Sequence, residues 1–281
     1  MMVFRRDLFK DKVVIVTGGG TGIGKSIARS FGELGARVVI TSRKEEHFLS
    51  AREALEKSGI DCLALRCDIR EIGEVESLVD SVIKNFGKID VLVNNAGGQF
   101  PSPAENITPK GWAAVINNNL NGTFNVTLTV ANKWMIPQSG GKIINIVANM
   151  WRGFPGLAHT GAARAGVANL TMTLAVEWAR HKITINAVAP GTIATEGLRV
   201  YPREIIESQR SVVPLKRFGR PADVSQLVLF LASPAGDYIT GAIVPVDGGE
   251  RLWSSIWQIP DDEEAKKESE KMLEESSDGA W

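Results

Sequence analysis

The chain has 281 residues, of which 44% are hydrophobic and 23% are charged, as is usual for a globular protein. Its 32 Lys and Arg residues balance 32 Asp and Glu residues, which argues against nucleic acid or an anionic membrane as a partner. No apolar run is long enough to cross a bilayer, and Met1–Lys12 leads into no apolar signal-peptide core. We therefore expect a cytoplasmic protein.

Short apolar runs alternate with helical patterns along most of the chain. Strands are predicted at Val13–Val16, Arg37–Thr41, Cys62–Arg66, Val91–Val93, Ile143–Val147, Ile183–Val188 and Ala242–Val246. Helices are predicted between Gly24 and Gly35 and at Glu45–Ser58, Glu71–Phe86, Gly111–Met135, Thr160–Arg180 and Ala222–Leu231. This alternation indicates an α/β fold, a doubly wound parallel sheet with helices on both faces. No linker interrupts it, so residues 1–249 are predicted to form one Rossmann-type domain.

Two segments depart from the alternation. Residues 192–217 carry Gly, Pro and mixed polarity between a strand and a helix, which is typical of a lid over a site. Residues 250–281 form a charged C-terminal tail, in which Asp261–Ser277 has the pattern of a solvated helix. Trp253, Trp257 and Trp281 are unusual in such a tail, and we expect them to pack on a neighbouring subunit.

The two cysteines, Cys62 and Cys67, are predicted on one strand with an odd separation, which places them on opposite faces. Their spacing fits neither a metal site nor a redox motif. We expect two buried free thiols in a reducing compartment.

A glycine-rich loop joins the first strand to the first helix with the spacing Gly-x-x-x-Gly-x-Gly. Glycines at such a junction let backbone N–H groups approach a pyrophosphate, and the helix N-terminus adds partial positive charge. The sequence therefore predicts a dinucleotide site that includes Gly18, Thr21, Gly22, Ile23 and Gly24.

The second strand ends in Ser42, Arg43 and Lys44, where a carboxylate would select an unphosphorylated ribose. A hydroxyl and two cations instead favour the 2′-phosphate of NADP(H), although the cations could also simply face solvent. Asp68 follows the third strand and could accept a hydrogen bond from adenine or cap the next helix. Asn94, Ala96 and Gly97 follow the fourth strand, where small residues permit close approach to the cofactor.

Four segments in this order resemble the short-chain dehydrogenase/reductase superfamily: Thr17–Gly24, Asn94–Gly97, Asn119–Phe124 and Pro190–Thr195. The resemblance spans residues 12–249 and implies a seven-stranded doubly wound sheet and a homotetramer built on two long helices. It also implies cofactor contacts from Ile69, Arg164, Pro190, Gly191, Ile193 and Thr195.

A narrower resemblance rests on Gly98–Glu105, Lys110–Trp112 and His159–Gly166. These segments are similar to peroxisomal trans-2-enoyl-CoA reductases and, more distantly, to 2,4-dienoyl-CoA reductases. Such enzymes use NADPH to reduce a C=C bond conjugated to a thioester, and the resemblance implies an acyl thioester, with CoA as its carrier, as the substrate. The last residues, Asp278–Trp281, are not a peroxisomal address.

The expected catalytic residues depart from the superfamily pattern of a tyrosine four residues before a lysine. Thr160 occupies the tyrosine position and Arg164 the lysine position, while Val147 or Ala148 replaces the usual serine. A threonine hydroxyl is too weak an acid for ordinary ketone reduction. Arg164 still carries a permanent charge that can bind ribose hydroxyls.

Reduction of an enoyl thioester does not require a strong acid at position 160. Hydride goes to the β-carbon, and negative charge builds on the thioester oxygen, where fixed hydrogen-bond donors stabilise it. Candidate donors are Thr160, which could instead cap its helix, and His159, which titrates near neutrality. Asn119 matches the family asparagine that holds a water relay, or it only supports its helix.

Three residues beyond these have an expected place near the substrate. Met150 and Trp151 are expected to line the acyl pocket. Tyr201 lies in the predicted lid and could reach the substrate, although a lid-surface position is the simpler interpretation.

The favoured function is NADPH-dependent reduction of a 2-enoyl thioester. Two alternatives stay open at this point: a short-chain ketone or alcohol oxidoreductase of the 3-oxoacyl type, and a catalytically silent NADP-binding protein. No metal site is expected.

Overall fold

The parallel sheet is complete in the computed structural model, which describes residues 4–201, 203–252 and 260–277. Its seven strands lie in the order β3-β2-β1-β4-β5-β6-β7, and every neighbouring pair is parallel. The strand order changes direction between β1 and β4, which is where ligands bind in sheets of this type. The predicted fold class is confirmed.

The strands end within two residues of their predicted limits. They are β1 Val13–Thr17, β2 Arg37–Ser42, β3 Cys62–Arg66, β4 Val91–Asn94, β5 Gly141–Ile146, β6 Ile183–Pro190 and β7 Ile243–Val246. The helices of the main alternation are α1 Gly22–Glu33, α2 Glu45–Lys57, α3 Ile72–Phe86, α4 Pro109–Ile116, α5 Gly122–Val130, α6 Ile136–Gln138, α7 Ala158–Trp178 and α9 Pro221–Ala232. Two more helices, α8 Arg203–Val212 and α10 Glu263–Ser277, lie in the segment predicted to be a lid and in the C-terminal tail.

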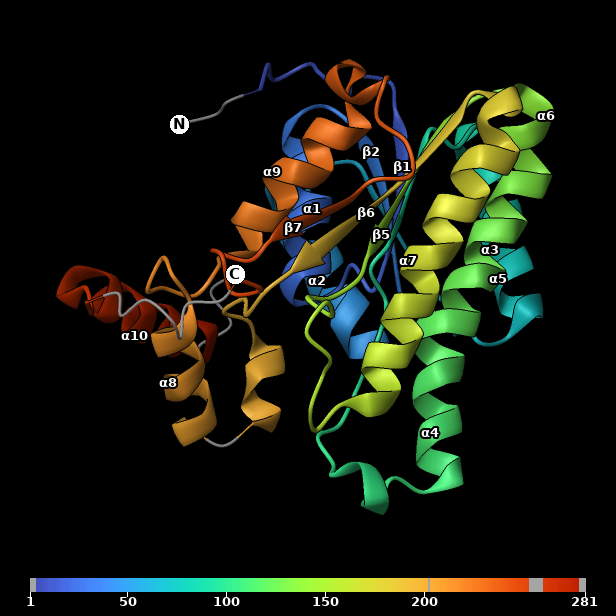
Figure 1. Cartoon of the computed structure of the whole chain (residues 1–281). Helices are drawn as coiled ribbons and strands as arrows, with labels where there is room; N and C mark the ends of the chain where they lie inside the picture. The colour runs from blue at the N-terminus through green and yellow to red at the C-terminus, as the bar shows by residue number, and fades with distance from the viewer. Residues whose placement is uncertain (1–3, 202, 253–259, 278–281) are drawn as a thin grey trace.

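Helices cover both faces of the sheet, with α1, α2 and α9 on one face and α3, α5 and α7 on the other (Figure 1). Successive side chains of a strand point to opposite faces, so β1 contributes to two cores. Val14 and Val16 belong to the core under α1, whereas Val13 and Ile15 belong to the core under α3 and α5. This is why the buried strands consist of continuous apolar runs.

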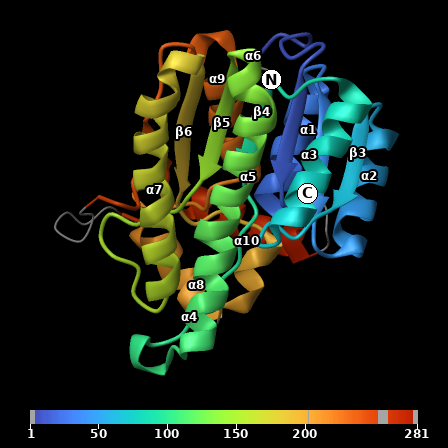
Figure 2. The same ribbon diagram turned by 90° about the vertical axis from the view of Figure 1, so that its right-hand side faces the viewer.

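The long helix predicted at Gly111–Met135 is one rod that contains two π-turns, Asn117–Asn121 and Ala131–Met135, between α4, α5 and α6. Figure 2 shows this rod standing beside α7 along one face of the sheet. Single π-turns within α-helices often occur at functional sites. The first π-turn carries Asn119.

Cys62 and Cys67 are both buried and free, as predicted. Cys62 packs in the core under α1 and Cys67 in the core under α3, so they do lie on opposite faces, although Cys67 follows β3 rather than belonging to it. Burial raises the pKa of both thiols to about 12, which keeps them protonated and unreactive at neutral pH. Within the described ranges, no helix has both the length and the apolar character needed to cross a bilayer.

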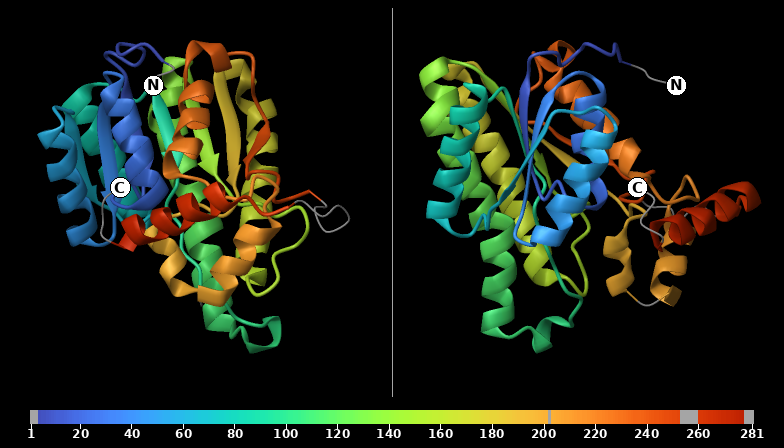
Figure 3. Two further views of the ribbon diagram at one scale, coloured as in Figure 1. Left: turned by 90° about the vertical axis from the view of Figure 1, so that its left-hand side faces the viewer. Right: turned by 180° about the vertical axis from the view of Figure 1, so that it is seen from behind.

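The tail helix α10 differs from the solvated helix predicted by its charge pattern. Ser269 and Met272 are only 1% and 2% exposed. Met272 packs against Ala194, in the predicted lid segment, and against Phe218, just after it, and Ser269 Oγ accepts a hydrogen bond from Phe218 N at 3.4 Å. Figure 3 shows α10 close to α8, at the end of the sheet where the strands have their carboxyl ends. The three tail tryptophans lie outside the described residues.

The buried face of α10 predicts a local effect of Met272→Ala. The variant loses a buried side chain, a change that typically costs about 2–5 kcal/mol, and α10 should detach from the lid. We expect trypsin to cleave the native variant at Lys266 and Lys267 faster than it cleaves native wild type. Mass spectrometry of the fragments measures both rates. Glu270→Ala, on the exposed face of α10, is the control. Equal cleavage rates in the two variants would contradict the packing described above.

Candidate active site

The glycine-rich loop leaves β1 and turns into the N-terminus of α1 (Figure 1). Gly18 and Gly22 have φ angles of +64° and +50°, which strain any residue with a side chain. A Cβ on Gly24 would collide with Gly18 O and Asn95 Nδ2. The loop is therefore a bare backbone turn beneath which α1 presents its first N–H groups, a fit for a pyrophosphate. Thr21 and Ile23 flank the turn without being fully buried.

Asn95 holds this loop, and the sequence prediction did not include it. Its Nδ2 donates to Thr17 O at 3.0 Å and to Gly18 O at 3.2 Å. Thr17 Oγ1 in turn accepts from the backbone N–H groups of Asn95 and Ala96, both at 3.0 Å. The end of β4 and the glycine-rich loop are thus tied by side chain to backbone bonds. The repeated asparagine at residues 94–95 was the only sequence signal for this role.

The cationic end of β2 lies at the surface beside this loop. Arg43 and Lys44 are exposed, and Ser42 Oγ accepts from Lys44 N at 3.3 Å. Among the described residues no carboxylate pairs with Arg43, while Lys44 Nζ lies 3.9 Å from a Glu46 oxygen. Arg43 is therefore a cation available to a phosphate. This arrangement fits a 2′-phosphorylated cofactor.

Asp68 is buried, and its carboxylate is already hydrogen-bonded within the protein. Its carboxylate accepts from the backbone and side chain of Arg70, and the Arg70 guanidinium is the main reason why the pKa of Asp68 is lowered. Helix α3 begins at Ile72 after Glu71, so Asp68 does not cap it. The neighbouring Ile69 is buried against Gly122 of α5.

The residues after β4 divide between structural and cofactor-facing positions. Asn94 is 2% exposed, and its Nδ2 donates to Thr127 Oγ1 and to Asn145 Oδ1, so it links β4 to α5 and β5. Ala96 and Gly97 are less buried. A side chain on Gly97 would collide with Arg164 Nη2 and with Asn119 Oδ1. Gly97 therefore makes room for the guanidinium of Arg164, which packs directly against it.

The loop after β6 forms the opposite wall. Gly191 N donates to Val246 O at 3.0 Å, which ties the loop to the end of β7 just after Pro190. Ile193 pairs with Gly219 through Ala194 N and Thr192 O, so its own N–H and C=O point away from Gly219. Its side chain is buried in the core. Thr195 lies next to Gly22, so the lid segment begins against the glycine-rich loop.

Glu250 supports this wall from the start of the tail. Its carboxylate accepts from Thr192 N at 2.8 Å and from Thr192 Oγ1 at 3.4 Å. Only a glycine fits at position 191, because a Cβ there would meet Glu250 Oε2. Burial raises the pKa of Glu250 above its ordinary value, partly offset by the bonds from Thr192. No sequence motif pointed to this residue.

Arg164 is buried, with 8% of its surface exposed, beside Gly97 and Asn119. Its Nη1 donates to Ile146 O at 2.9 Å, and within the described part of the chain no carboxylate forms an ion pair with it. Burial lowers its pKa to about 10, so it remains charged at neutral pH. A buried cation without a counter-ion is costly unless polar or anionic groups surround its remaining donors. A bound ligand that offers such a group would therefore be stabilised here.

Thr160 lies one helical turn before Arg164 on the same face of α7, and both it and His159 are 0% exposed. Leu157 rather than Thr160 precedes the helix, so Thr160 is not its cap. His159 Nδ1 accepts from Thr160 N at 2.8 Å and lies 3.2 Å from Thr160 Oγ1. Burial lowers the pKa of His159, so the ring is neutral and carries its proton on Nε2, which is buried without a partner.

Asn119 is committed to positioning. Its Nδ2 donates to Gly98 O at 2.7 Å and to Val115 O at 2.9 Å, and its Oδ1 accepts from Gly98 N at 3.2 Å. The two bonds to Gly98 fasten the loop after β4 to the π-turn, and the bond to Val115 lies within the helical rod. The whole side-chain amide is therefore used inside the protein.

The chain matches the family model described as enoyl-(acyl carrier protein) reductase over residues 18–250. It is 39% identical over 255 residues to a peroxisomal 2,4-dienoyl-CoA reductase of Pongo abelii, covering 89% of this chain and 87% of that protein. It is also 39% identical to the 3-oxoacyl-[acyl-carrier-protein] reductase FabG of Thermotoga maritima, covering 85% and 97%. The chain belongs to the short-chain dehydrogenase/reductase family.

A solved structure of the citronellol catabolism dehydrogenase AtuB of Pseudomonas aeruginosa PAO1 matches this family member with a TM-score of 0.81. The two chains are 41% identical, and the match covers 89% of this chain and 99% of the other. The protein is therefore an oxidoreductase of the short-chain dehydrogenase/reductase family, as predicted. The predicted likeness to the dienoyl-CoA reductase branch is confirmed, alongside an equal likeness to a 3-oxoacyl reductase.

Aromatic side chains surround the entrance in front of Thr160. Phe100 packs edge-on against the His159 ring at a centroid distance of 4.6 Å, and Phe154 lies against Gly161. The loops that carry Phe100 and Trp151 are joined where Ser102 N donates to Gly156 O at 2.8 Å. Phe100 and Trp151 are both substantially exposed. These side chains can cover an acyl chain.

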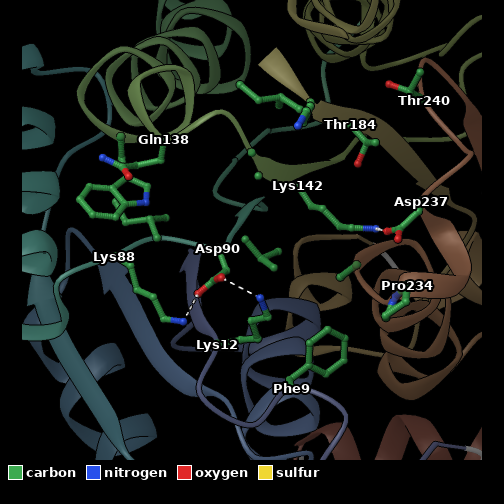
Figure 4. Close-up of a pocket in the computed structure, with 18 of the residues that line it drawn as sticks. Phe9, Lys12, Lys88, Asp90, Gln138, Lys142, Thr184, Pro234, Asp237 and Thr240 are labelled. Carbon is green, nitrogen blue, oxygen red and sulfur yellow. Dashed lines mark hydrogen bonds and ion pairs between the residues drawn. The ribbon is translucent and has the colours of Figure 1, made fainter. Parts of the chain in front are cut away.

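A cavity of about 830 Å³ lies at the other end of this reductase, beyond the amino ends of the strands (Figure 4). Its charged side chains are largely satisfied by one another. Asp90 pairs with Lys12 at 2.9 Å and with Lys88 at 3.3 Å, and Lys142 pairs with Asp237 at 2.6 Å. The cofactor and catalytic candidates all lie at the carboxyl ends instead.

The raised pKa of Glu250 predicts that the stability of the protein depends on pH. Because its folded pKa is raised, the folded protein binds this proton more tightly than the unfolded chain does. The free energy of unfolding should therefore fall as the pH rises from about 4.3, the ordinary glutamate pKa, to the folded value, and then level off. Glu250→Gln keeps an acceptor for Thr192 N and should remove this contribution, so that the variant gains stability relative to wild type across that window.

The measurement is urea denaturation between pH 4 and pH 8. Glu53→Gln, at an exposed position on α2, is the control. Parallel stability curves for wild type and Glu250→Gln would show that the buried carboxylate carries no such cost.

Proposed function

We propose that this oxidoreductase reduces the C=C bond of a 2-enoyl thioester with NADPH. The observation that supports this most directly is the buried, unpaired Arg164 beside Thr160, on a helix with no phenol. Such a site stabilises negative charge on an oxygen but has no acid on α7 to protonate it. An enoyl thioester needs this kind of stabilisation, because the charge that develops on its oxygen is delocalised to the α-carbon.

The proposed cofactor site combines the elements described above. The glycine-rich loop and the N-terminus of α1 would bind the pyrophosphate, Arg43 the 2′-phosphate and Arg164 the nicotinamide ribose. A reduced nicotinamide held there would supply hydride to the β-carbon of the substrate. Ile193, whose backbone polar groups point away from Gly219, would fix the ring from the opposite wall.

The acyl group would lie between Phe100 and Trp151, with its thioester oxygen directed at Thr160 Oγ1 and Arg164. His159 is neutral in this environment, so we assign it the positioning of Thr160 rather than the delivery of a proton. Asn119 holds Gly98 and with it the loop that carries Phe100.

A 3-oxoacyl reductase is the second candidate, because the likeness to FabG is as strong as the likeness to a dienoyl-CoA reductase. Reduction of its ketone would require a proton at oxygen, for which Thr160 is a poor source. A silent NADP-binding protein is the third candidate. The bare glycine-rich loop and the preserved wall after β6 both speak against loss of function.

One assay separates the three. Purified protein is mixed with NADPH and, in turn, crotonyl-CoA, a longer 2-enoyl-CoA, a 2,4-dienoyl-CoA and acetoacetyl-CoA, and oxidation of the cofactor is followed at 340 nm. We expect turnover of the unsaturated thioesters and little or none of acetoacetyl-CoA. Turnover of acetoacetyl-CoA alone would establish the 3-oxoacyl reductase, and cofactor binding without turnover would establish the silent protein.

Arg43→Asp should shift cofactor preference from NADPH toward NADH. A hydrogen bond to a charged group contributes about 1.5–3 kcal/mol, so the affinity for NADPH should fall roughly 10–100-fold. Fluorescence titration with each cofactor gives both dissociation constants. Lys57→Asp, an exposed charge reversal at the end of α2, should leave both unchanged. Unaltered NADPH affinity in Arg43→Asp would refute the role of Arg43 at the 2′-phosphate.

Subunit association and location complete the proposal. Exposed apolar side chains gather on α5 and α7, which lie side by side in Figure 2, and Val176 is 80% exposed. We propose that these helices form the interface of a homotetramer, which sedimentation would test. The free buried thiols favour a reducing compartment, and we propose the cytoplasm.

A further inference from the structure

Tyr201 reaches the entrance of the site from the lid. Its backbone N–H donates to Leu198 O at 3.0 Å, which anchors it at the end of the short helical turn Glu196–Val200. Its phenolic oxygen accepts from Gln99 Nε2 at 2.6 Å, although the two residues are 102 positions apart in the chain. Tyr201 is partly buried.

The partner of Tyr201 sits between two residues that contact the catalytic candidates. Gly98, immediately before Gln99, exchanges hydrogen bonds with Asn119. Phe100, immediately after it, packs on His159, whose neighbour is Thr160. Gln99 therefore places the Tyr201 phenol against the same short loop, Gly98–Phe100, that contacts Asn119 and His159.

The direction of the Gln99 bond leaves the phenolic proton available. Because Gln99 Nε2 donates, Tyr201 Oη is the acceptor, and its own O–H can point toward a ligand. The same bond would stabilise the charge left on the oxygen after the proton has gone. The other polar groups of the site are engaged differently: His159 is neutral and bound to Thr160 N, Thr160 is an alcohol, and Arg164 is a cation that donates to Ile146 O.

We propose that Tyr201 is a catalytic residue that protonates the α-carbon of the reduced thioester, an inference that rests on the proposed function. When hydride reaches the β-carbon, the electron pair of the C=C bond moves to the thioester oxygen and gives an enolate. The enolate pair then forms the new C–H bond at the α-carbon with the Tyr201 proton, and the O–H bond breaks. Water returns a proton to the phenolate, so the sum is one hydride and one proton added across the double bond.

A phenol outside α7 suffices for this reaction. A ketone reductase must protonate an oxygen in step with hydride transfer, which demands an acid tuned by an adjacent cation. An enolate carbon is a much stronger base than a phenolate, so the transfer from a phenol is downhill. The acid only has to lie near the α-carbon, and Tyr201 is the tyrosine whose phenol contacts the Gly98–Phe100 loop.

The first test compares wild type, Tyr201→Phe and Tyr238→Phe in the enoyl-CoA assay. Tyr238 is the only other tyrosine and is fully exposed beside the opposite end of the sheet, so Tyr238→Phe is a matched control. A positioned general acid contributes roughly 10²–10⁴-fold, so kcat of Tyr201→Phe should fall at least about 100-fold. KM for crotonyl-CoA and the dissociation constant of NADPH should change less than about threefold. A kcat within about threefold of wild type, or an effect on KM alone, would overturn the proposal.

The second test does not depend on turnover. In Tyr238→Phe labelled with 3-fluorotyrosine, Tyr201 gives the single fluorine resonance. Addition of butanoyl-CoA, the saturated product, in the presence of NADP⁺ should shift it, and free CoA should shift it less. An unmoved resonance at saturating butanoyl-CoA, with saturation followed by tryptophan fluorescence, would also overturn the proposal.

The two assays separate this inference from the proposed function. If wild type reduces no unsaturated thioester, the proposed function fails and the proton transfer fails with it. If wild type is active and Tyr201→Phe matches it, only the assignment of Tyr201 fails.

Discussion

Ligand binding at the candidate site depends on one buried charge, the guanidinium of Arg164. Arg164 projects from α7, donates from Nη1 to Ile146 O, and has no carboxylate beside it among the described residues. Burying a guanidinium without a counter-ion costs free energy, which a polar or anionic ligand would offset. Gly97 makes room for the guanidinium because it has no side chain, and Asn119 Oδ1 lies close to the same glycine. Binding of a polar ligand is therefore favoured at this point of the sheet.

Two further groups hold the walls around this charge. Asn95 fixes the glycine-rich loop from β4, and Glu250 fixes the loop after β6 from the start of the tail. Helix α10 then packs on Ala194 and Phe218, next to the pair formed by Ile193 and Gly219. The C-terminal segment is thus part of the wall of the site. The charge pattern of α10 does not reveal this contact, because a single buried row of small and apolar side chains is enough to dock a helix.

The absence of a phenol from α7 separates two requirements that a ketone reductase meets with one residue. Stabilisation of an oxyanion can come from fixed donors such as Arg164 and Thr160. Delivery of a proton can come from another direction, provided the acceptor is a carbon conjugated to that oxygen. The contact between Gln99 and Tyr201 places the second function in the lid, on a segment that reaches the opposite side of the cleft.

The strands and the glycine-rich turn could be predicted from the sequence because their causes are local. Continuous β-branched runs such as Val13–Val16 are buried on both faces, and Gly18 and Gly22 adopt the left-handed conformations that favour glycine. The free, buried state of Cys62 and Cys67 also followed from spacing and burial. The hydrogen bonds of Asn94 did not, because its partners Thr127 and Asn145 are 33 and 51 positions away in the chain.

By itself the sequence determined the sheet, the order of the helices, the place of the cofactor loop and the loss of the usual tyrosine. Only the tertiary structure decided which polar groups are paired, and pairing controls their chemistry. Asn94 is bound to Asn145, His159 is neutral because it is buried, and Glu250 is buried under Thr192. Each of these states depends on what lies nearby in space, because desolvation and hydrogen bonding act over a few ångströms whatever the separation in sequence.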